Sequence, residues 1–168
     1  AVRRVVGERG APARVGNRRD GREEGLERTI TRAVIDVNPV EARLLPDDVL
    51  HIGLRAFQSN STRELEAALD RAAQETASRT GIRGIILDMR NNPGGLLIEA
   101  VRICDLFLEE GVIVSTRGRA GQELQRNEAR RRGTRPNWPM VVLVNRFSAS
   151  AAEIVAGALR DHERALLV

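Results

Sequence analysis

The sequence predicts an α/β fold with a largely parallel sheet at its centre. From Val49 onward, short apolar runs typical of buried strands alternate with longer segments whose apolar residues recur at helical spacing. Strands joined through single helices form right-handed crossover units and build a parallel sheet with covered faces. A hydrophobic content of 42% over 168 residues allows a real core and argues against disorder.

The expected elements alternate in order along this part of the chain. We expect strands at the apolar runs 49–54, 84–88, 111–115, 140–144 and 165–168. Amphipathic segments predict helices from residue 61 to about 78, from 96 to about 108 and from 150 to about 159. Ser61 and Glu64 have the spacing of a capping box, which favours a helix start at Ser61.

Residues 1–36 differ in character from residues 37–168, and we predict a domain boundary between them. Polar and apolar residues roughly alternate over Leu26–Ile35, which predicts a half-buried strand in the tail of a small β-rich module. The chain starts at Ala1 without methionine, and residues 165–168 have the pattern of a buried strand that stops midway. We therefore expect a fragment of a longer protein.

The composition excludes several kinds of site. All 27 basic residues are arginine, and with 23 acidic residues the net charge is +4. The absence of lysine excludes a lysine nucleophile, Schiff base or general base within this chain. A single cysteine excludes an intrachain disulfide and a cysteine-rich zinc cage. Aromatic residues, 2% of the chain, are too sparse for rows of base-stacking platforms, and no apolar run approaches the length of a membrane helix.

Two strand-to-helix turns are the expected places for chemistry, because such sheets bind ligands at the carboxyl ends of their strands. The first turn, Asp88–Gly95, contains a Pro-Gly-Gly step that lets the backbone approach a ligand. N–H groups at the following helix start favour developing negative charge. The turn lacks the Lys-Ser/Thr ending of a Walker phosphate loop, and a plain tight turn is the alternative interpretation.

The second turn, Val144–Glu153, places Ser150 at a helix start among small residues. A serine there lies beside free N–H donors that can hold the oxyanion of a tetrahedral intermediate. Ser150 and Glu153 also have the spacing of a capping box, in which the hydroxyl bonds the backbone and does no chemistry. Spacing alone favours the capping interpretation.

Residues 84–97, GIILDMRNNPGGLL, and residues 142–161, VLVNRFSASAAEIVAGALRD, together carry a family resemblance. They closely resemble the carboxyl-terminal processing peptidases, also called tail-specific proteases. The resemblance continues between the two segments and covers essentially the whole chain from Leu26. Upstream, Ala1–Gly10 is similar to the last helix and glycine turn of the PDZ module that these enzymes carry.

The resemblance implies a serine endopeptidase with a Ser/Lys dyad on a crotonase-like α/β core. The family's nucleophile matches Ser150. Its oxyanion donors match the backbone N–H groups of Ala151 and of a glycine in the Pro-Gly-Gly turn, for which we choose Gly95, with Gly94 as the alternative. A motif acid after the helix matches Asp161, which implies a structural or orienting role.

The general base of the family is a lysine in a Gly-Lys-Gly step downstream of the nucleophile. This chain ends 18 residues after Ser150, before such a step. We therefore expect residues 37–168 to be an incomplete peptidase core and residues 1–36 to be the C-terminal remnant of a PDZ-like module. Ala152 stands where many members have a further serine, and this difference should matter little because the position lies past the nucleophile.

The resemblance also implies partners and location. We expect protein or peptide substrates with accessible C-termini, and no cofactor, metal or nucleic acid. The expected location is the bacterial periplasm or the outer face of the inner membrane, with anchoring through a segment outside these residues. The alternative is a non-catalytic relative that only binds peptide ends and lacks the downstream lysine.

Other chemistry-bearing residues are expected to be structural. A continued helix would place His162 about 18 Å from the serine, beyond hydrogen-bond reach. His51 is expected to be an exposed strand histidine, and Cys104 a packing residue on an apolar helix face. The charged clusters Asp47–Asp48 and Arg130–Arg132 are expected to be a turn and a solvated loop.

Overall fold

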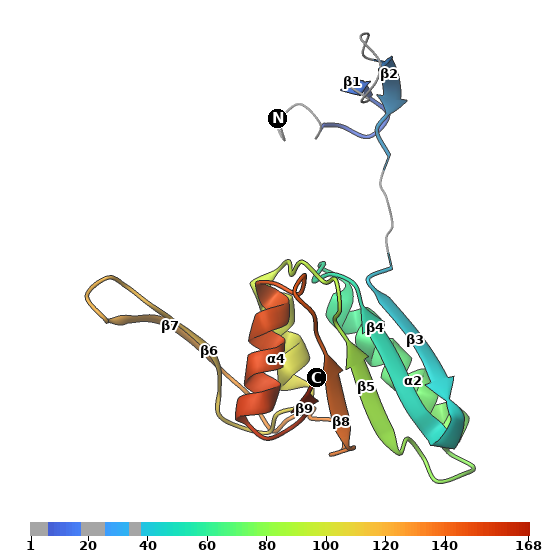
Figure 1. The fold of residues 1–168 in the computed structure, drawn as a ribbon, viewed down its shortest axis with the longest axis vertical. Coiled ribbons are helices and arrows are strands. Elements are labelled where there is room, and N and C mark those ends of the chain that lie inside the picture. Colours follow the sequence, from blue (N-terminus) through green and yellow to red (C-terminus); the bar gives the residue numbers. More distant parts are fainter. Residues whose placement is uncertain (1–6, 18–25, 34–37) are drawn as a thin grey trace. The chain divides into compact units, whose positions relative to one another are not determined.

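A computed structural model describes residues 7–17, 26–33 and 38–168 (Figure 1). Contacts divide the chain into two compact units, Ala1–Val37 and Asn38–Val168.

The first unit contains a pair of antiparallel strands, β1 (Pro12–Asn17) and β2 (Leu26–Thr31). β2 confirms the start of the strand expected at Leu26. The expected helix near the start of the chain falls on residues 1–6, outside the described residues. The assignment of this unit to a PDZ-like remnant stays a prediction.

A five-stranded sheet organises the second unit in the order β3-β4-β5-β8-β9 (Figure 1). Its strands are β3 (Val40–Leu45), β4 (Val49–Leu54), β5 (Gly84–Asp88), β8 (Met140–Leu143) and β9 (Leu166–Leu167). β3 runs antiparallel to β4, and the other neighbours are parallel. The predicted α/β fold with a largely parallel sheet is confirmed.

One strand of this sheet, β3, was not predicted from the sequence. It lies at the sheet edge, and its exposed residues 41–43 lack the apolar character of a buried strand. A short 3-10 turn, η1 (Pro46–Asp48), joins β3 to β4, as expected of Asp47–Asp48.

Among the described residues, three α-helices connect the strands: α2 (Ser61–Thr76), α3 (Leu97–Asp105) and α4 (Ala151–Asp161). They form one core with alternate strand residues such as Ile52 and Leu87, which are fully buried. The intervening strand residues, such as Ile86, are only half-buried. The helices of the described chain therefore cover one face of the sheet, and the expectation of two covered faces is wrong.

The strands β6 (Val112–Arg117) and β7 (Glu123–Glu128) form a hairpin separate from the five-stranded sheet (Figure 1). β6 confirms the strand expected at residues 111–115, but it does not enter the main sheet. β7 escaped prediction because all its residues but Leu124 are polar and nearly all are exposed, so the sequence shows no buried face there.

The capping box expected at Ser61 does not form, because the Ser61 hydroxyl donates to the Ala56 carbonyl at 3.0 Å instead. A residue far along the chain, Glu99, holds the first turn of α2. The carboxylate of Glu99, which is 1% exposed, accepts the backbone N–H of Thr62 at 2.9 Å and its hydroxyl at 2.6 Å. Burial alone would raise the pKa of Glu99, but hydrogen bonds from Thr62 and Arg102 outweigh it and lower that pKa.

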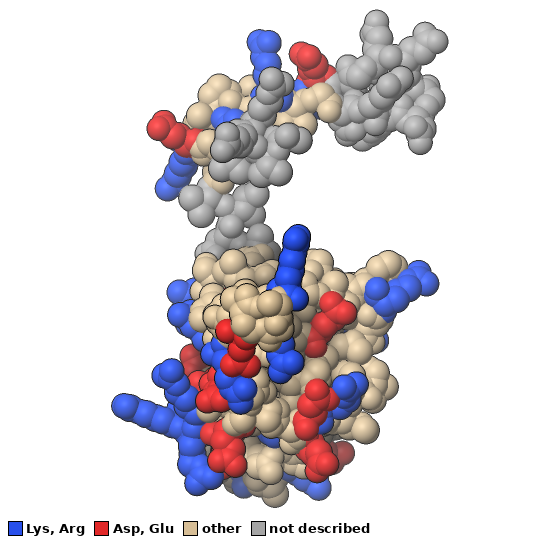
Figure 2. Space-filling model, turned by 90° about the vertical axis from the view of Figure 1, so that its left-hand side faces the viewer, with Lys and Arg blue, Asp and Glu red and all other residues tan. Residues whose placement is uncertain are grey.

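The surface of the second unit carries both signs of charge. Arg135 pairs with Asp70 at 2.6 Å, and Arg131 pairs with Glu109 at 2.9 Å. Figure 2 shows arginine and acidic side chains interspersed on one face of this unit. The net charge of +4 is therefore not gathered into a single basic patch on the face in view.

Candidate active site

The two predicted turns lie side by side, because β5 and β8 are neighbouring parallel strands. We name them the β5–α3 turn, residues 89–96, and the β8–α4 turn, residues 144–150. Where the ladder ends, the N–H of Met89 donates to the Leu143 carbonyl at 2.9 Å. Both turns therefore start at the same edge of the sheet, as expected for parallel strands.

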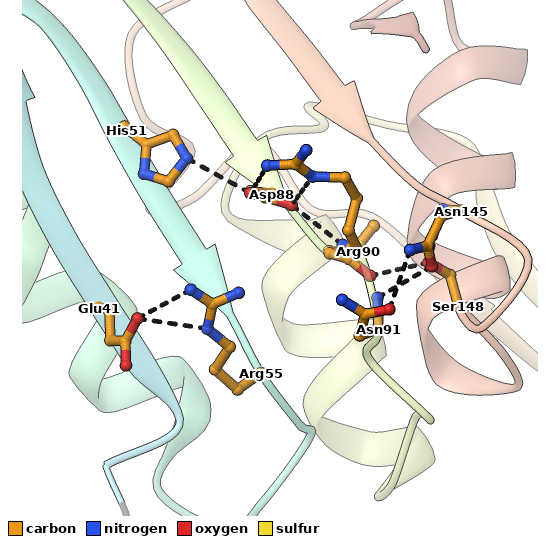
Figure 3. Close-up of polar contacts among 9 residues, drawn as sticks. Glu41, His51, Arg55, Asp88, Arg90, Asn91, Asn145 and Ser148 are labelled. Carbon is orange, nitrogen blue, oxygen red and sulfur yellow. Dashed lines mark hydrogen bonds and ion pairs between the residues drawn. The ribbon is translucent and has the colours of Figure 1, made fainter.

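Side chains join the two turns (Figure 3). Asn145 Oδ1 accepts the N–H of Asn91 at 3.0 Å, and Asn145 Nδ2 donates to Asn91 Oδ1 at 2.9 Å. The Ser148 hydroxyl donates to the Met89 carbonyl at 2.8 Å. The first serine of the Ser-Ala-Ser run is therefore a bridge between the turns.

β5 ends at a nearly buried carboxylate, Asp88, whose side chain is 4% exposed (Figure 3). The Arg90 guanidinium donates to it at 2.9 and 2.6 Å, and the Arg90 backbone N–H donates at 3.0 Å. The side-chain hydrogen bonds from Arg90 outweigh burial and lower the pKa of Asp88 to about 2. The same carboxylate holds the chain in the bend that begins the β5–α3 turn.

His51 lies on β4 beside this carboxylate, with Nε2 3.4 Å from Asp88 Oδ2. Its side chain is 17% exposed, so the expectation of an exposed strand histidine is wrong. The sequence pattern placed the ring on the face opposite Leu50 and Ile52 correctly, but the parallel register brings Asp88 of the next strand against that ring.

Asn92 is a fully buried polar residue in the β5–α3 turn. Its carboxamide nitrogen donates to the Leu54 carbonyl at 2.8 Å, and its carboxamide oxygen accepts the N–H of Gly94 at 2.8 Å. Its backbone carbonyl accepts the N–H of Ala149 at 3.0 Å. One residue therefore links β4, the glycine step and the β8–α4 turn.

Phe57 fixes the direction of the peptide between the two glycines. Its N–H donates to the Gly94 carbonyl at 2.9 Å, and its carbonyl accepts the N–H of Leu96 at 2.8 Å. Because a trans peptide points its C=O and N–H in opposite directions, the N–H of Gly95 faces away from Phe57. A Cβ on Gly95 would run into the Phe57 carbonyl, and its φ of +142° is one that L side chains rarely adopt, so this position requires glycine.

Gly94 lies directly against the β8–α4 turn. A Cβ at this position would lie 2.7 Å from the Ala149 carbonyl oxygen and 2.8 Å from Ser150 Cβ. Within the described ranges, no protein acceptor takes the N–H of Gly95 or of Ala151, whereas the N–H of Gly94 is held by Asn92. Of the two glycines, Gly95 is therefore the one with an N–H left for a ligand.

Ser150 immediately precedes α4 in a backbone conformation of φ 55° and ψ −115°, which L residues rarely adopt. Its N–H donates to Glu153 Oε2 at 2.6 Å. The hydroxyl faces the Glu153 N–H in a capping-box arrangement, but no cap hydrogen bond of normal geometry joins them. The Glu153 N–H donates instead to the Ser150 carbonyl at 3.0 Å. The exposed hydroxyl is therefore left available for chemistry.

An exposed serine packed against Gly94, with the N–H groups of Gly95 and Ala151 left without a protein acceptor in the described residues, is an arrangement that can support acyl transfer. The family model described as peptidase family S41 matches residues 48–168. This chain belongs to peptidase family S41.

Two curated relatives are similar to this S41 chain over most of its length. The carboxy-terminal-processing protease of Bartonella bacilliformis is 38% identical over 168 residues, which are 100% of this chain and 38% of the relative. The carboxyl-terminal-processing protease of Synechocystis is 42% identical over 154 residues, 88% of this chain and 34% of the relative. The chain thus spans little more than a third of the length of these relatives.

Solved structures share the fold. The photosystem II D1 C-terminal processing protease superposes with a TM-score of 0.68 at 27% identity, covering 96% of this chain and 44% of that protein. A putative peptidase from Parabacteroides merdae superposes with a TM-score of 0.61 at 23% identity, covering 79% of this chain and 43% of that one.

The structure does not bring Asp161 to Ser150. Asp161 ends the 11-residue helix α4, is exposed, and pairs with its neighbour Arg160 at 2.7 Å. At 1.5 Å per residue, the helix separates the carboxylate from the serine by about 16 Å. His162 follows at the same far end, where Nε2 lies 2.9 Å from the Val112 carbonyl, so its expected distance from the serine is confirmed.

Cys104 is fully buried on α3, and burial raises the pKa of its thiol to about 12. Its expected packing role is confirmed. In the described parts of the S41 chain, no three His, Cys, Asp or Glu residues gather as a metal site, and no helix has both the length and the apolar character of a membrane span.

Sequence patterns missed the structural roles of Asn92 and Asn145. The available signal was the run of asparagines directly after a strand, since asparagine side chains bond nearby backbone groups and shape turns. Their partners, Leu54 and Asn91, lie 38 and 54 residues away, which no local pattern reveals.

Proposed function

We propose that this chain carries the nucleophile of a serine endopeptidase of the carboxyl-terminal processing type. One observation carries the proposal: in a chain of family S41, the exposed Ser150 lies against Gly94, and the N–H groups of Gly95 and Ala151 next to this contact have no protein acceptor among the described residues. Two such donors stabilise the oxyanion of a tetrahedral intermediate, and each is worth about 10²–10³ in kcat.

The proposed reaction is acyl transfer in two steps. Ser150 Oγ attacks the scissile carbonyl carbon and gives its proton to a base, while the carbonyl oxygen becomes an oxyanion held by the two N–H groups. The C–N bond then breaks, the leaving amine takes the proton, and the acyl group stays on Oγ. Water hydrolyses this ester by the same route and frees the serine.

The proposed base is a lysine supplied from beyond Val168, because a serine hydroxyl needs a base and arginine stays protonated. β9 runs parallel to β8, and the N–H of Val144 donates to the Val168 carbonyl at 2.9 Å. Residues that follow Val168 in a longer protein would thus leave the sheet beside the β8–α4 turn. A cavity of about 390 Å³ at this edge, lined in part by Ser148 and Glu153, is large enough for a lysine side chain.

We extend the proposal to the parts that the family resemblance implies. Residues 1–36 are the C-terminal remnant of a PDZ-like module, and the α/β core is crotonase-like. Substrates are proteins cleaved near accessible C-termini. The enzyme acts in the periplasm or at the outer face of the bacterial inner membrane. Cell fractionation tests this location.

The test assays the complete protein, its Ser150→Ala variant and residues 1–168 alone on an unstructured protein substrate. We expect cleavage by the complete protein only, since the short chain contains no lysine. Serine-dependent cleavage by residues 1–168 would place the base within them, with His51 as the first candidate. A complete protein that lacks a Gly-Lys-Gly step after Val168, binds peptide ends and cleaves none would support the alternative, a non-catalytic relative.

A further inference from the structure

We propose that Asn92 is a positioning residue that selects Gly95, and not Gly94, as the oxyanion donor. The inference rests on the proposed function of Ser150 as nucleophile. Asn92 touches no substrate atom in this role. It acts through the two backbone segments that would hold the oxyanion.

The Asn92 carboxamide fits its surroundings in one orientation only. On one side the Leu54 carbonyl requires a donor, and on the other the Gly94 N–H requires an acceptor, both at 2.8 Å. The residue is 0% exposed, so water does not replace either partner. Turning the amide over would place donor against donor and acceptor against acceptor, which a buried site penalises strongly.

Two consequences follow for the glycine step. The N–H of Gly94 is occupied, so it does not compete for the oxyanion. Asn92 holds the N–H of Gly94, and the Phe57 N–H holds the Gly94 carbonyl at 2.9 Å. These two bonds fix the peptide plane between Gly94 and Gly95, and the N–H of Gly95 stays unoccupied. Donors that are fixed before the reaction stabilise an oxyanion better than donors that must reorient.

Asn92 also sets the second donor through its backbone. Its carbonyl accepts the N–H of Ala149 at 3.0 Å, one residue before Ser150 and two before Ala151. The same residue therefore holds both segments that carry the oxyanion donors. Asn145 joins the same two turns but bonds neither glycine, so it links the segments without selecting the donor.

The first test needs no substitution. The complete protein is labelled with ¹⁵N-glycine and ¹⁵N-alanine and treated with a peptide aldehyde, which adds to a nucleophilic serine as a hemiacetal. We expect the amide resonances of Gly95 and Ala151 to shift strongly and that of Gly94 to shift little. A larger shift at Gly94 than at Gly95 would overturn the inference.

The second test uses Asn92→Asp and Asn92→Ala in the complete protein. Asp keeps an acceptor for Gly94 but loses the donor to Leu54, whereas Ala loses both. We expect kcat to fall by about 10-fold to 10³-fold, more for Ala, with KM changed by less than about 3-fold and aldehyde affinity falling in parallel with kcat. Loss of kcat without loss of aldehyde affinity, or unchanged kcat in a folded variant, would overturn the inference.

Thr76→Val is the matched control, because it removes a buried side-chain hydrogen bond outside the proposed site. Thr76 is 0% exposed and its hydroxyl donates to the Ala72 carbonyl at 2.8 Å, near the end of α2. We expect this variant to unfold at a lower temperature with unchanged kcat and aldehyde affinity. If the wild-type protein forms no Ser150-dependent adduct and cleaves nothing, the proposed function fails; an adduct with the wrong glycine responding overturns only the role of Asn92.

Discussion

The β5–α3 turn and the β8–α4 turn start at the same edge of the sheet, yet Asn92 in the first and Ser150 in the second differ in how far the protein uses their side chains. In the β5–α3 turn, Met89 and Asn92 are fully buried, and the Asn92 carboxamide uses both its donor and its acceptor on the protein. In the β8–α4 turn, Phe147 is 55% exposed and the Ser150 hydroxyl makes no cap hydrogen bond. The Asn92 side chain is therefore held on both sides, whereas the Ser150 side chain is exposed.

This difference matches the two demands of acyl transfer. Oxyanion donors must be held before the reaction, because donors that reorient lose most of their advantage. A nucleophile must instead keep its hydroxyl free to reach the carbonyl and the base. In the second turn, Asn145 and Ser148 bond the first turn, and Glu153 accepts the Ser150 N–H at 2.6 Å. The backbone of the serine is therefore held while its side chain stays exposed.

Removing the free hydroxyl tests the comparison most severely. We expect Ser150→Ala in the complete protein to abolish peptide hydrolysis and to change the free energy of unfolding by less than about 1 kcal/mol, since the hydroxyl makes no cap bond. Ser148→Ala is the control: it loses the bond to Met89 and should lower stability by about 1 kcal/mol while hydrolysis persists. Activity in the Ser150 variant, measured by substrate cleavage and denaturant unfolding, would contradict the assignment.

Distorting the β5–α3 turn at Gly95 has the next largest expected effect on activity. Gly95→Val forces a β-branched side chain into the Phe57 carbonyl at a φ of +142°, which displaces the N–H of residue 95. We expect kcat to fall by about 10²–10³-fold with a smaller change in KM. Gly16→Ala, at a glycine with open space around it, serves as the control. Unchanged turnover in a soluble Gly95→Val variant would remove Gly95 from the site.

Releasing the restraint on the second turn has a smaller effect. Glu153→Ala removes the acceptor of the Ser150 N–H, and we expect kcat to fall by about 10-fold because a charge-assisted hydrogen bond is lost. Glu153→Gln keeps an oxygen acceptor and should recover most of that loss. Equal kinetics for the Ala and Gln variants would show that this hydrogen bond does not position the serine.

The smallest expected effect is on acid stability. The pKa of Asp88 is about 2 in the folded protein, below its ordinary 3.8, so its contribution is present above about pH 4 and is lost as the pH falls through 2. With Arg90 half-exposed, we expect this contribution to be about 1–2 kcal/mol. Urea unfolding of wild type and Asp88→Asn between pH 2 and 5 measures it. The same pH slope in both proteins would rule out Asp88 as the cause.

Local patterns in the sequence determined most of the framework around the site. The apolar runs at β5 and β8 and the helical periodicity of α3 and α4 follow from burial on one face, which adjacent residues record directly. The prediction that chemistry gathers at the carboxyl ends of these strands needed only their parallel order. The same parallel order pointed to the paired glycines and Ser150, because they lie in the turns that follow these strands.

Only the tertiary structure decided the hydrogen-bond partners of those residues. The family resemblance favoured Gly95, with Gly94 as the alternative. In the fold, Asn92 accepts the Gly94 N–H and Phe57 donates to the Gly94 carbonyl, so the Gly95 N–H is the one left open. Spacing favoured Ser150 as a cap. In the fold the two residues keep the capping-box arrangement, but the Glu153 N–H donates to the Ser150 carbonyl at 3.0 Å and the Ser150 side chain is exposed. The Glu99 cap on α2 and the contact between His51 and Asp88 likewise join distant residues. Periodicity reports which side of an element is buried, but hydrogen-bond partners depend on strand register and on which elements pack together, and these are settled only when the chain is folded.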